Sequence, residues 1–366
     1  MKRKILENFN WSLWSAIFAL VGIGLVNLYS ALNVWGEGGM VHLFWHQLIW
    51  IGIGLLILVV FVSMDYRFWY KLCWFFYGLS ILLLVLVILV GKDVSGNKSW
   101  LELGVFSMQP SEFAKLGLVF VLAKYFSDNP QPMGYGFKEL LKPLGLTLVP
   151  MLLVLLEKDL GGTLFYPLIF ATLAYVARLR KKAVILFFCI ISVVGVAAYQ
   201  YGLKPYQKER IRVFLNPEAD ARKGGYHLVQ SKIAVGSGQI FGKGYLKGQI
   251  NKLRYLPDRH TDFIFPVLAE EWGLVGSLLT LGLYAFILWS GIGIAIRARE
   301  PFGSFLATGV VAILFWHLVI NVCGVLGMIP LTGVPLPFLS YGGSSTVAFL
   351  IGIGLLLNIH MRRFMF

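Results

Sequence analysis

Apolar runs of about twenty residues, the length that crosses a hydrocarbon core as a helix, recur from one end of the chain to the other. Hydrophobic residues make up 58% of the sequence and charged residues only 14%, which excludes an ordinary water-soluble domain. The runs are continuous, whereas the strands of a membrane barrel alternate and are about 10 residues long. We therefore expect an all-α membrane protein, a polytopic bundle of about ten transmembrane helices.

The expected helices form a single transmembrane domain that takes in residues 1–366. The predicted spans are 11–31, 43–63, 70–91, 111–126, 142–158, 160–178, 183–201, 262–292, 303–327 and 343–361. A basic start at residues 1–4 followed by an apolar run resembles a signal peptide, but no small-residue cleavage site follows it. The first span is therefore expected to be retained.

Basic residues in the short connections predict the orientation, because such residues stay preferentially on the cytoplasmic side during insertion. Twelve such residues fall on the side of the N-terminus: Arg67, Lys71, Lys124, Lys138, Arg178, Arg180, Lys181, Lys182, Arg297, Arg299, Arg362 and Arg363. We expect a multi-pass protein of the cytoplasmic (inner) membrane with both termini in the cytoplasm.

Residues 202–260 form a long polar connection that this topology places outside the membrane. Its twelve Lys or Arg residues against four Asp or Glu leave an excess of eight positive charges. Long loops cross the membrane largely regardless of charge, so the topology stands. Anionic headgroups or a phosphorylated substrate would match this charge, and the loop could equally lie solvated on anionic lipid. Nucleic acid is not expected, because no aromatic residues are interleaved for base readout.

A glycine-rich run at residues 235–248 lies inside this loop and matches neither the dinucleotide fingerprint nor the P-loop. Glycines let backbone amides approach an anion, and Lys243 and Lys247 add charge, so pyrophosphate contact is chemically reasonable. A mobile hinge explains the glycines equally well. Residues 227–234 resemble a short amphipathic helix on the membrane surface.

Asp262 carries the strongest local signal, because it stands where the basic loop enters the eighth span. A carboxylate partly desolvated beside Phe263 and Phe265, with His260 and Arg259 nearby, has the environment of a general base. The alternative is that Asp262 caps the helix beginning at Phe263. From chemistry alone, both interpretations remain open.

Five further charged residues lie in or beside the spans: Glu112, Lys115, Asp159, Glu270 and Glu271. Acids inside a membrane are candidates for function. Glu112 and Lys115 have the spacing that brings two side chains together on one helix face. An ion pair or a turn would be the structural explanation of these residues.

Five segments together resemble the SEDS family of bacterial cell-wall synthesis, whose members include RodA, FtsW and SpoVE. They are QPSEFAK at 109–115, DLGGT at 159–163, the stretch 233–248, HTDFIFPVLAEEWG at 260–273 and GVPLPFLSYGGSS at 333–345. The resemblance covers essentially the whole chain. Arg259 and the 333–337 run look more like the rod-shape elongation protein RodA than like the division protein FtsW.

The resemblance implies a peptidoglycan glycosyltransferase, which polymerises lipid II at the outer face of the membrane and releases undecaprenyl pyrophosphate, during cell elongation and shape maintenance. Asp262 matches the aspartate that the family requires, with the implied role of deprotonating the acceptor 4-hydroxyl, directly or with a divalent cation (Mg²⁺ or Mn²⁺). Glu112 and Lys115 match a polar pair of the central cavity, and Asp159 matches the aspartate of the family's DLGT-like turn.

Further substrate contacts are expected from His260 and, for the lipid pyrophosphate, from Lys243, Lys247 and Arg254. Three positions depart from the family's pattern: Lys158 stands where proline is common, Gly162 is an added glycine, and Ser99 replaces an arginine.

The resemblance also implies a complex with a class B penicillin-binding protein, a transpeptidase, and other elongation-complex proteins. Two other classes of function fit the same spans and buried acids: a transporter, such as a lipid II flippase or an ion-coupled permease, and a noncatalytic scaffold. Polymer formation in detergent separates the enzyme from the pure transporter, because detergent abolishes compartments.

Overall fold

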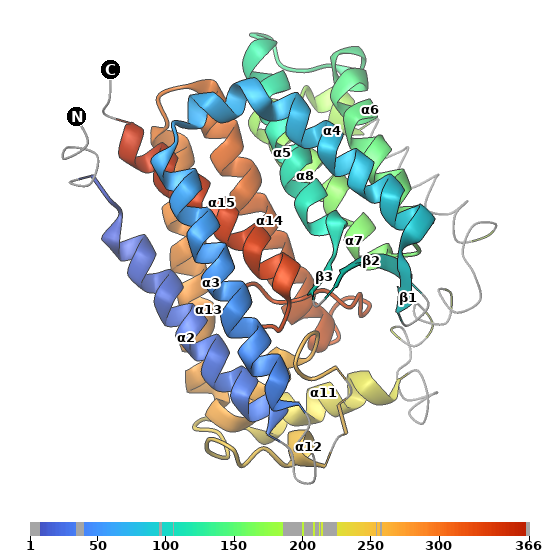
Figure 1. Cartoon of the computed structure of the whole chain (residues 1–366), viewed down its shortest axis with the longest axis vertical. Coiled ribbons are helices and arrows are strands. Elements are labelled where there is room, and N and C mark those ends of the chain that lie inside the picture. The colour runs from blue at the N-terminus through green and yellow to red at the C-terminus, as the bar shows by residue number, and fades with distance from the viewer. Residues whose placement is uncertain are drawn as a thin grey trace.

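The computed structural model describes residues 8–33, 40–94, 97–104, 106–185, 225–253, 255–256 and 258–363, with the single positions 200, 208, 212 and 214. The long helices run side by side as a bundle (Figure 1). They are α2 (Trp11–Leu32), α3 (Val41–Ser63), α4 (Tyr66–Val90), α5 (Pro110–Asp128), α6 (Phe137–Leu156), α8 (Phe165–Val176), α13 (Ile264–Arg297), α14 (Pro301–Val325) and α15 (Gly343–Arg362).

Within the described residues, seven helices are long and apolar enough to cross a membrane: α2, α3, α4, α6, α13, α14 and α15. The polytopic helical fold is therefore confirmed. The predicted span 160–178 is a shorter apolar stretch, which divides into α7 (Leu160–Thr163) and α8. Most of the predicted span 183–201, most of the loop up to residue 224 and Arg254 lie outside the described residues.

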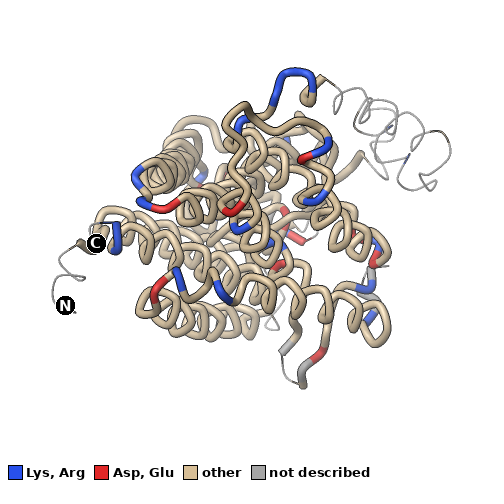
Figure 2. The backbone as a smooth tube through the Cα atoms, turned by 90° about the horizontal axis from the view of Figure 1, so that it is seen from above, with Lys and Arg blue, Asp and Glu red and all other residues tan. Residues whose placement is uncertain are grey.

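The helices differ in how much of their surface the protein covers. In α3 only 22% of the most apolar window is buried, whereas in α15 the figure is 94%, so α15 lies in the centre of the bundle. The outer helices are almost entirely free of charged residues along their length (Figure 2). Apolar outer faces are what contact with lipid requires. The first residues of α2 and the last residues of α15 lie at the same end of the bundle (Figure 1).

Helix α13 is broken at Gly273, which has φ 65° and ψ −160°. The glycine-rich run folds over this break, and residues 238–248 are called the glycine strap below. The strap donates from Lys243 N to Glu270 O (3.0 Å) and accepts at Gln239 O from Leu274 N (2.8 Å). It thus satisfies backbone groups that the break frees, which is a requirement inside a membrane. A Cβ on Gly238 would overlap the Ala269 carbonyl, so this close approach needs glycine.

Three short elements complete the end of the bundle away from the termini (Figure 1). Helix α11 (Tyr226–Ser237) includes the helix predicted at 227–234, and α12 (Gln249–Lys252) follows the strap. An antiparallel sheet in the order β1-β2-β3 joins α4 to α5, with β1 (Lys92–Val94), β2 (Asn97–Leu103) and β3 (Phe106–Met108). This sheet was not predicted, because the sequence there reads as a polar break between spans.

Candidate active site

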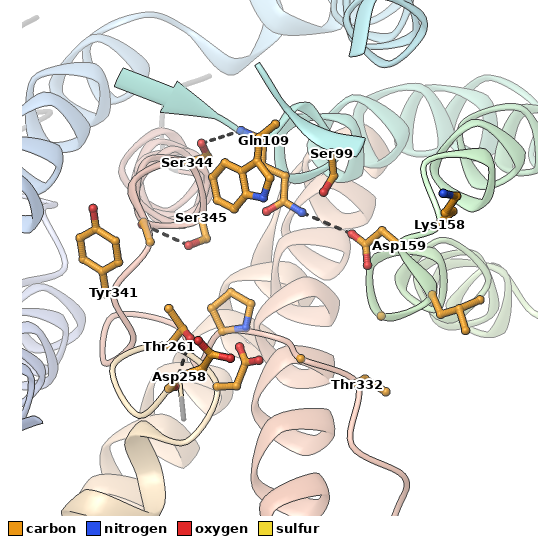
Figure 3. Close-up of a pocket in the computed structure, with 17 residues that line it drawn as sticks. Ser99, Gln109, Lys158, Asp159, Asp258, Thr261, Thr332, Tyr341, Ser344 and Ser345 are labelled. Carbon is orange, nitrogen blue, oxygen red and sulfur yellow. Dashed lines mark hydrogen bonds between the residues drawn. The ribbon is translucent and has the colours of Figure 1, made fainter. Parts of the chain in front are cut away.

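A polar cavity of about 420 Å³ opens where six segments meet, toward the end of the bundle opposite the termini. The lining comes from β2, the start of α5, the turn before α7, the turn before α13, the segment 332–335 and the start of α15 (Figure 3). Segments distant in sequence therefore share one space. Three carboxylates line it: Asp159, Asp258 and Asp262.

Asp262 and Asp258 belong to one tight turn that leads into α13. Asp258 has a positive φ of 46°, and its carbonyl accepts from Thr261 N (3.0 Å) and Asp262 N (3.1 Å). The helix begins at Ile264, with Phe263 at the cap position and no side-chain cap hydrogen bond. Phe263, and not Asp262, therefore occupies the cap position. The Asp262 side chain is part of the cavity lining.

The opposite wall is built around the turn before α7, as Figure 3 shows. One oxygen of Asp159 accepts from Gly162 N (2.8 Å) and the other from Gln109 Nε2 (3.3 Å). Gln109 N in turn donates to Ser344 Oγ (2.9 Å), which ties α5 to α15. Lys158 holds a positive φ of 66° and is the one cation among the described lining residues. Its side chain has no hydrogen bond or ion pair within the described chain.

Beside this wall lies Glu157, whose carboxylate is 1% exposed and makes no hydrogen bond within the described residues. Burial raises the pKa of Glu157 to about 8, and the neighbouring charge of Asp159 acts in the same direction. Glu157 is therefore largely protonated at neutral pH.

Glu112 and Lys115 do not line the cavity, although the resemblance placed them in it. They are buried between helices, 6% and 1% exposed, and form an ion pair of 2.8 Å. Lys115 Nζ also lies 2.8 Å from His317 Nε2 and over the ring of Phe165. Their position is therefore inside the bundle, where α5 faces α8 and α14.

Three further predicted substrate contacts that the structure describes, His260, Lys243 and Lys247, also lie outside the cavity lining. His260 adjoins it through Tyr341, whose N–H donates to His260 O (2.7 Å), and burial lowers the pKa of His260. Lys243 ion-pairs with Glu270 at 2.6 Å, so its charge is already used to hold the strap. Lys247 is exposed on the strap.

No group of three or more His, Cys, Asp or Glu residues in the described part of the chain could hold a metal ion. Asp258 and Asp262 nevertheless supply two carboxylates on one wall. Mg²⁺ is commonly bound by one or two carboxylates together with substrate phosphates. The lining therefore fits a cation that arrives with a phosphorylated substrate, and not a closed all-protein metal site.

Sequence reasoning missed Gln109, Lys158, Tyr341, Ser344 and Ser345 as site residues, although all five line the cavity. A signal was present in the run Ser-Tyr-Gly-Gly-Ser-Ser at 340–345, which is polar and stands directly before an apolar span. Lys158 was noted only as a departure from the family's pattern.

Comparison with known proteins decides the family. Residues 10–364 match the family of FtsW, RodA and SpoVE, described as cell cycle proteins. This chain belongs to that family. The peptidoglycan glycosyltransferase MrdB of Escherichia coli strain K12 is 36% identical over 341 residues, 92% of this chain and 90% of that protein.

Two further comparisons cover nearly the whole SEDS chain. Stage V sporulation protein E of Bacillus subtilis is 37% identical over 349 residues, 93% of each protein. A solved chain, from work on the structural coordination of polymerization and crosslinking by a peptidoglycan synthase complex, matches with a TM-score of 0.84. It is 32% identical, and the match covers 98% of this chain and 99% of the solved one. The relatives named MrdB and stage V sporulation protein E match at 36% and 37% identity, so these comparisons do not separate the paralogues.

Proposed function

We propose that this SEDS protein polymerises lipid II into glycan strands and that the cavity beside Asp262 is its active site. The chain is a peptidoglycan glycosyltransferase by its family and by the activity in the names of its curated relatives. The observation that carries the site is Asp262 itself, a carboxylate in the turn before α13 that lines a polar cavity. Asp262 would accept the proton of the acceptor 4-hydroxyl while that oxygen attacks the donor sugar and the pyrophosphate leaves.

The leaving pyrophosphate needs positive charge, because three carboxylates in the lining would otherwise repel it. Lys158 supplies this charge from the wall opposite the Asp262 turn (Figure 3). A divalent cation held by Asp258 and Asp262 would add neutralisation there and lower the pKa of a bound hydroxyl. Chelation with EDTA followed by readdition of Mg²⁺ or Mn²⁺ separates the two routes, since direct base catalysis by Asp262 survives chelation.

The proposal also covers the orientation of the chain in the membrane, its protein partner and the cellular process that it serves. With cytoplasmic termini, the cavity end faces outward, where lipid II is used. The similar solved chain comes from a peptidoglycan synthase complex, which supports a class B penicillin-binding protein as the partner of this chain. Arg259 and the 333–337 run support a role in elongation and shape maintenance. Co-purification from membranes tests the partner, and a full rate without it would contradict activation by the complex.

Purified protein incubated with lipid II in detergent tests the activity. We expect glycan polymer and undecaprenyl pyrophosphate. Detergent removes compartments, so a protein that only transports lipid II would leave it unchanged. Unreacted lipid II under conditions where the protein is folded and its partner is present would contradict the proposal.

Asp262→Asn tests the catalytic residue. Asparagine is nearly isosteric, but it cannot take up a proton, and loss of general-base assistance costs roughly 10²- to 10⁴-fold in rate. We expect this loss with normal insertion, abundance and partner binding. Folded Asp262→Asn protein that polymerises lipid II within a few-fold of the parent rate would exclude Asp262 as the base, even though the family assignment would stand.

A further inference from the structure

The backbone around Asp262 is held by hydrogen bonds from three other parts of the chain. Each donor satisfies one carbonyl of the turn or of the first helical residue: Tyr341 N to His260 O (2.7 Å), Ser340 Oγ to Thr261 O (2.5 Å), Asn321 Nδ2 to Asp262 O (2.9 Å) and Asn27 Nδ2 to Ile264 O (3.0 Å). The position of the Asp262 side chain is thus set from outside its own helix.

Asn321 differs from the other donors because it joins two walls of the cavity. Its Nδ2 also donates to Val334 O (2.7 Å), in the segment that lines the cavity beside Asp262. The two walls nearly touch there, since a Cβ on Gly333 would lie 3.1 Å from Asp262 Oδ2. Asn321 is 5% exposed, and its Oδ1 has no partner within the described residues, so the side chain acts as a donor only.

His317 lies one turn earlier on α14 and acts on the same segment. Its Nδ1 is 3.1 Å from Pro335 O, and a carbonyl can only accept, so Nδ1 carries the hydrogen. Nε2 is then the acceptor for the Lys115 ammonium at 2.8 Å, and Lys115 is paired with Glu112. Asn321 and His317, both on α14, therefore donate hydrogen bonds to two successive carbonyls, Val334 O and Pro335 O. His317 also links this segment to the buried ion pair of Lys115 and Glu112.

We propose that Asn321 is a positioning residue for Asp262, which fixes the Asp262 carboxylate against the 333–335 wall in the geometry that proton transfer needs. It does so through two backbone carbonyls and without touching substrate. Misplacement by about 1 Å can cost on the order of 10²-fold in rate. Loss of Asn321 should therefore lower kcat more than it raises the KM for lipid II. This inference rests on the proposed lipid II polymerisation.

Asn321→Ala and Asn321→Ser test the positioning role, with Asn358→Ala as the matched control. Asn358 is also a buried asparagine, and its Nδ2 donates to Phe61 O (2.6 Å) and Val62 O (3.1 Å) at the end of α3 that lies away from the cavity. Serine keeps one donor but can serve only one of the two carbonyls. Initial rates are measured against lipid II concentration and pH, per folded molecule, with a melting temperature for each protein.

We expect Asn321→Ala to lower kcat about 10- to 100-fold with KM within about threefold, and Asn321→Ser to lie between it and the parent. The acidic limb of the pH profile should shift in both, whereas Asn358→Ala should lower only the melting temperature. An unchanged kcat in the Asn321 variants would overturn the inference, and so would failure of both to fold while Asn358→Ala folds. Absence of polymer from the parent protein would instead overturn the proposed function.

Discussion

Helix α13 and the turn before it contain two acidic sites within ten residues, Glu270 with Glu271 and Asp262, and their surroundings differ. At Glu270, one carboxylate oxygen accepts from Lys243 Nζ (2.6 Å), Gln249 N (2.9 Å) and Ile250 N (3.2 Å). Glu271 accepts from Ser30 Oγ (2.6 Å) in the same buried region. Asp262, at the start of the helix, lines an open polar cavity.

The difference shows what separates a structural acid from a chemical one inside a membrane protein. Glu270 and Glu271 hold the glycine strap and α12 over a broken helix. In each, one carboxylate oxygen accepts the hydrogen bonds from the chain, and the other is buried without a partner among the described residues. Asp262 has its backbone held by the chain and its side chain beside a space that a substrate can enter. Both sites are functional candidates because they lie in or directly beside a membrane-spanning helix, and access to the cavity distinguishes them.

Glu270→Ala should have the largest effect on folding. It leaves Lys243 and two backbone N–H groups without their acceptor, and breaking a buried charge pair costs about 3–5 kcal/mol. We expect a strong loss of monodisperse protein in size-exclusion chromatography and a lowered melting temperature. Glu102→Ala is the control, because its ion pair with Lys92 is exposed and such pairs are worth about 0–1 kcal/mol. A well-folded but inactive Glu270→Ala protein would contradict the distinction between Glu270 as a structural acid and Asp262 as a chemical one.

Lys158→Gln should raise the KM for lipid II about tenfold, since a charge-assisted hydrogen bond to phosphate is worth about 1.5–3 kcal/mol. Lys158→Arg should recover most of this loss. Lys182→Gln is the matched control, an exposed lysine that does not line the cavity. An unchanged KM in Lys158→Gln would place the pyrophosphate elsewhere.

Lys247→Glu should have a smaller effect, a fall of about threefold in initial rate at low lipid II concentration. The residue is exposed on the strap and does not line the cavity, so it acts on an anionic substrate through a screened field. The effect should shrink at high ionic strength. Identical kinetics at every salt concentration would assign the charge of this loop to lipid attraction or to a protein partner.

Glu157→Gln should have an effect on stability that depends on pH. Because the folded-state pKa of about 8 exceeds the ordinary value of 4.5, the group favours folding most below pH 4.5. That contribution is lost as pH rises to 8. Glutamine cannot ionise, so the variant should match the parent near pH 5 and melt higher than the parent at pH 9. Parallel melting curves at both pH values would contradict the raised pKa.

The helices were predictable because their physical cause is local. A run such as Val41–Ser63 must be a spanning helix by length and hydropathy alone, and predicted and observed ends differ there by only two residues. Asp262 was predictable for a similar reason, since a carboxylate at the boundary of an apolar run stands out without knowledge of its neighbours.

The rest depended on contacts between distant segments, which no local pattern contains. The glycine strap was interpreted as a phosphate cradle or a hinge, and only the break at Gly273 explains why its amides are needed. Glu112 and Lys115 were correctly expected to lie on the same helix face. Their buried surroundings were not predictable, because they include His317, about two hundred residues away in sequence. Lys158 joins the site through the fold of the turn before α7.

The most direct test of the account measures Asp262→Asn and Glu270→Gln side by side for two quantities, the polymerisation rate per folded molecule and the melting temperature. The account predicts that Asp262→Asn keeps its melting temperature and loses roughly 10²- to 10⁴-fold in rate. It predicts that Glu270→Gln melts lower and that its folded fraction polymerises lipid II within a few-fold of the parent. Asp262→Asn protein with parental rate, or Glu270→Gln protein that is stable and inactive, would contradict it.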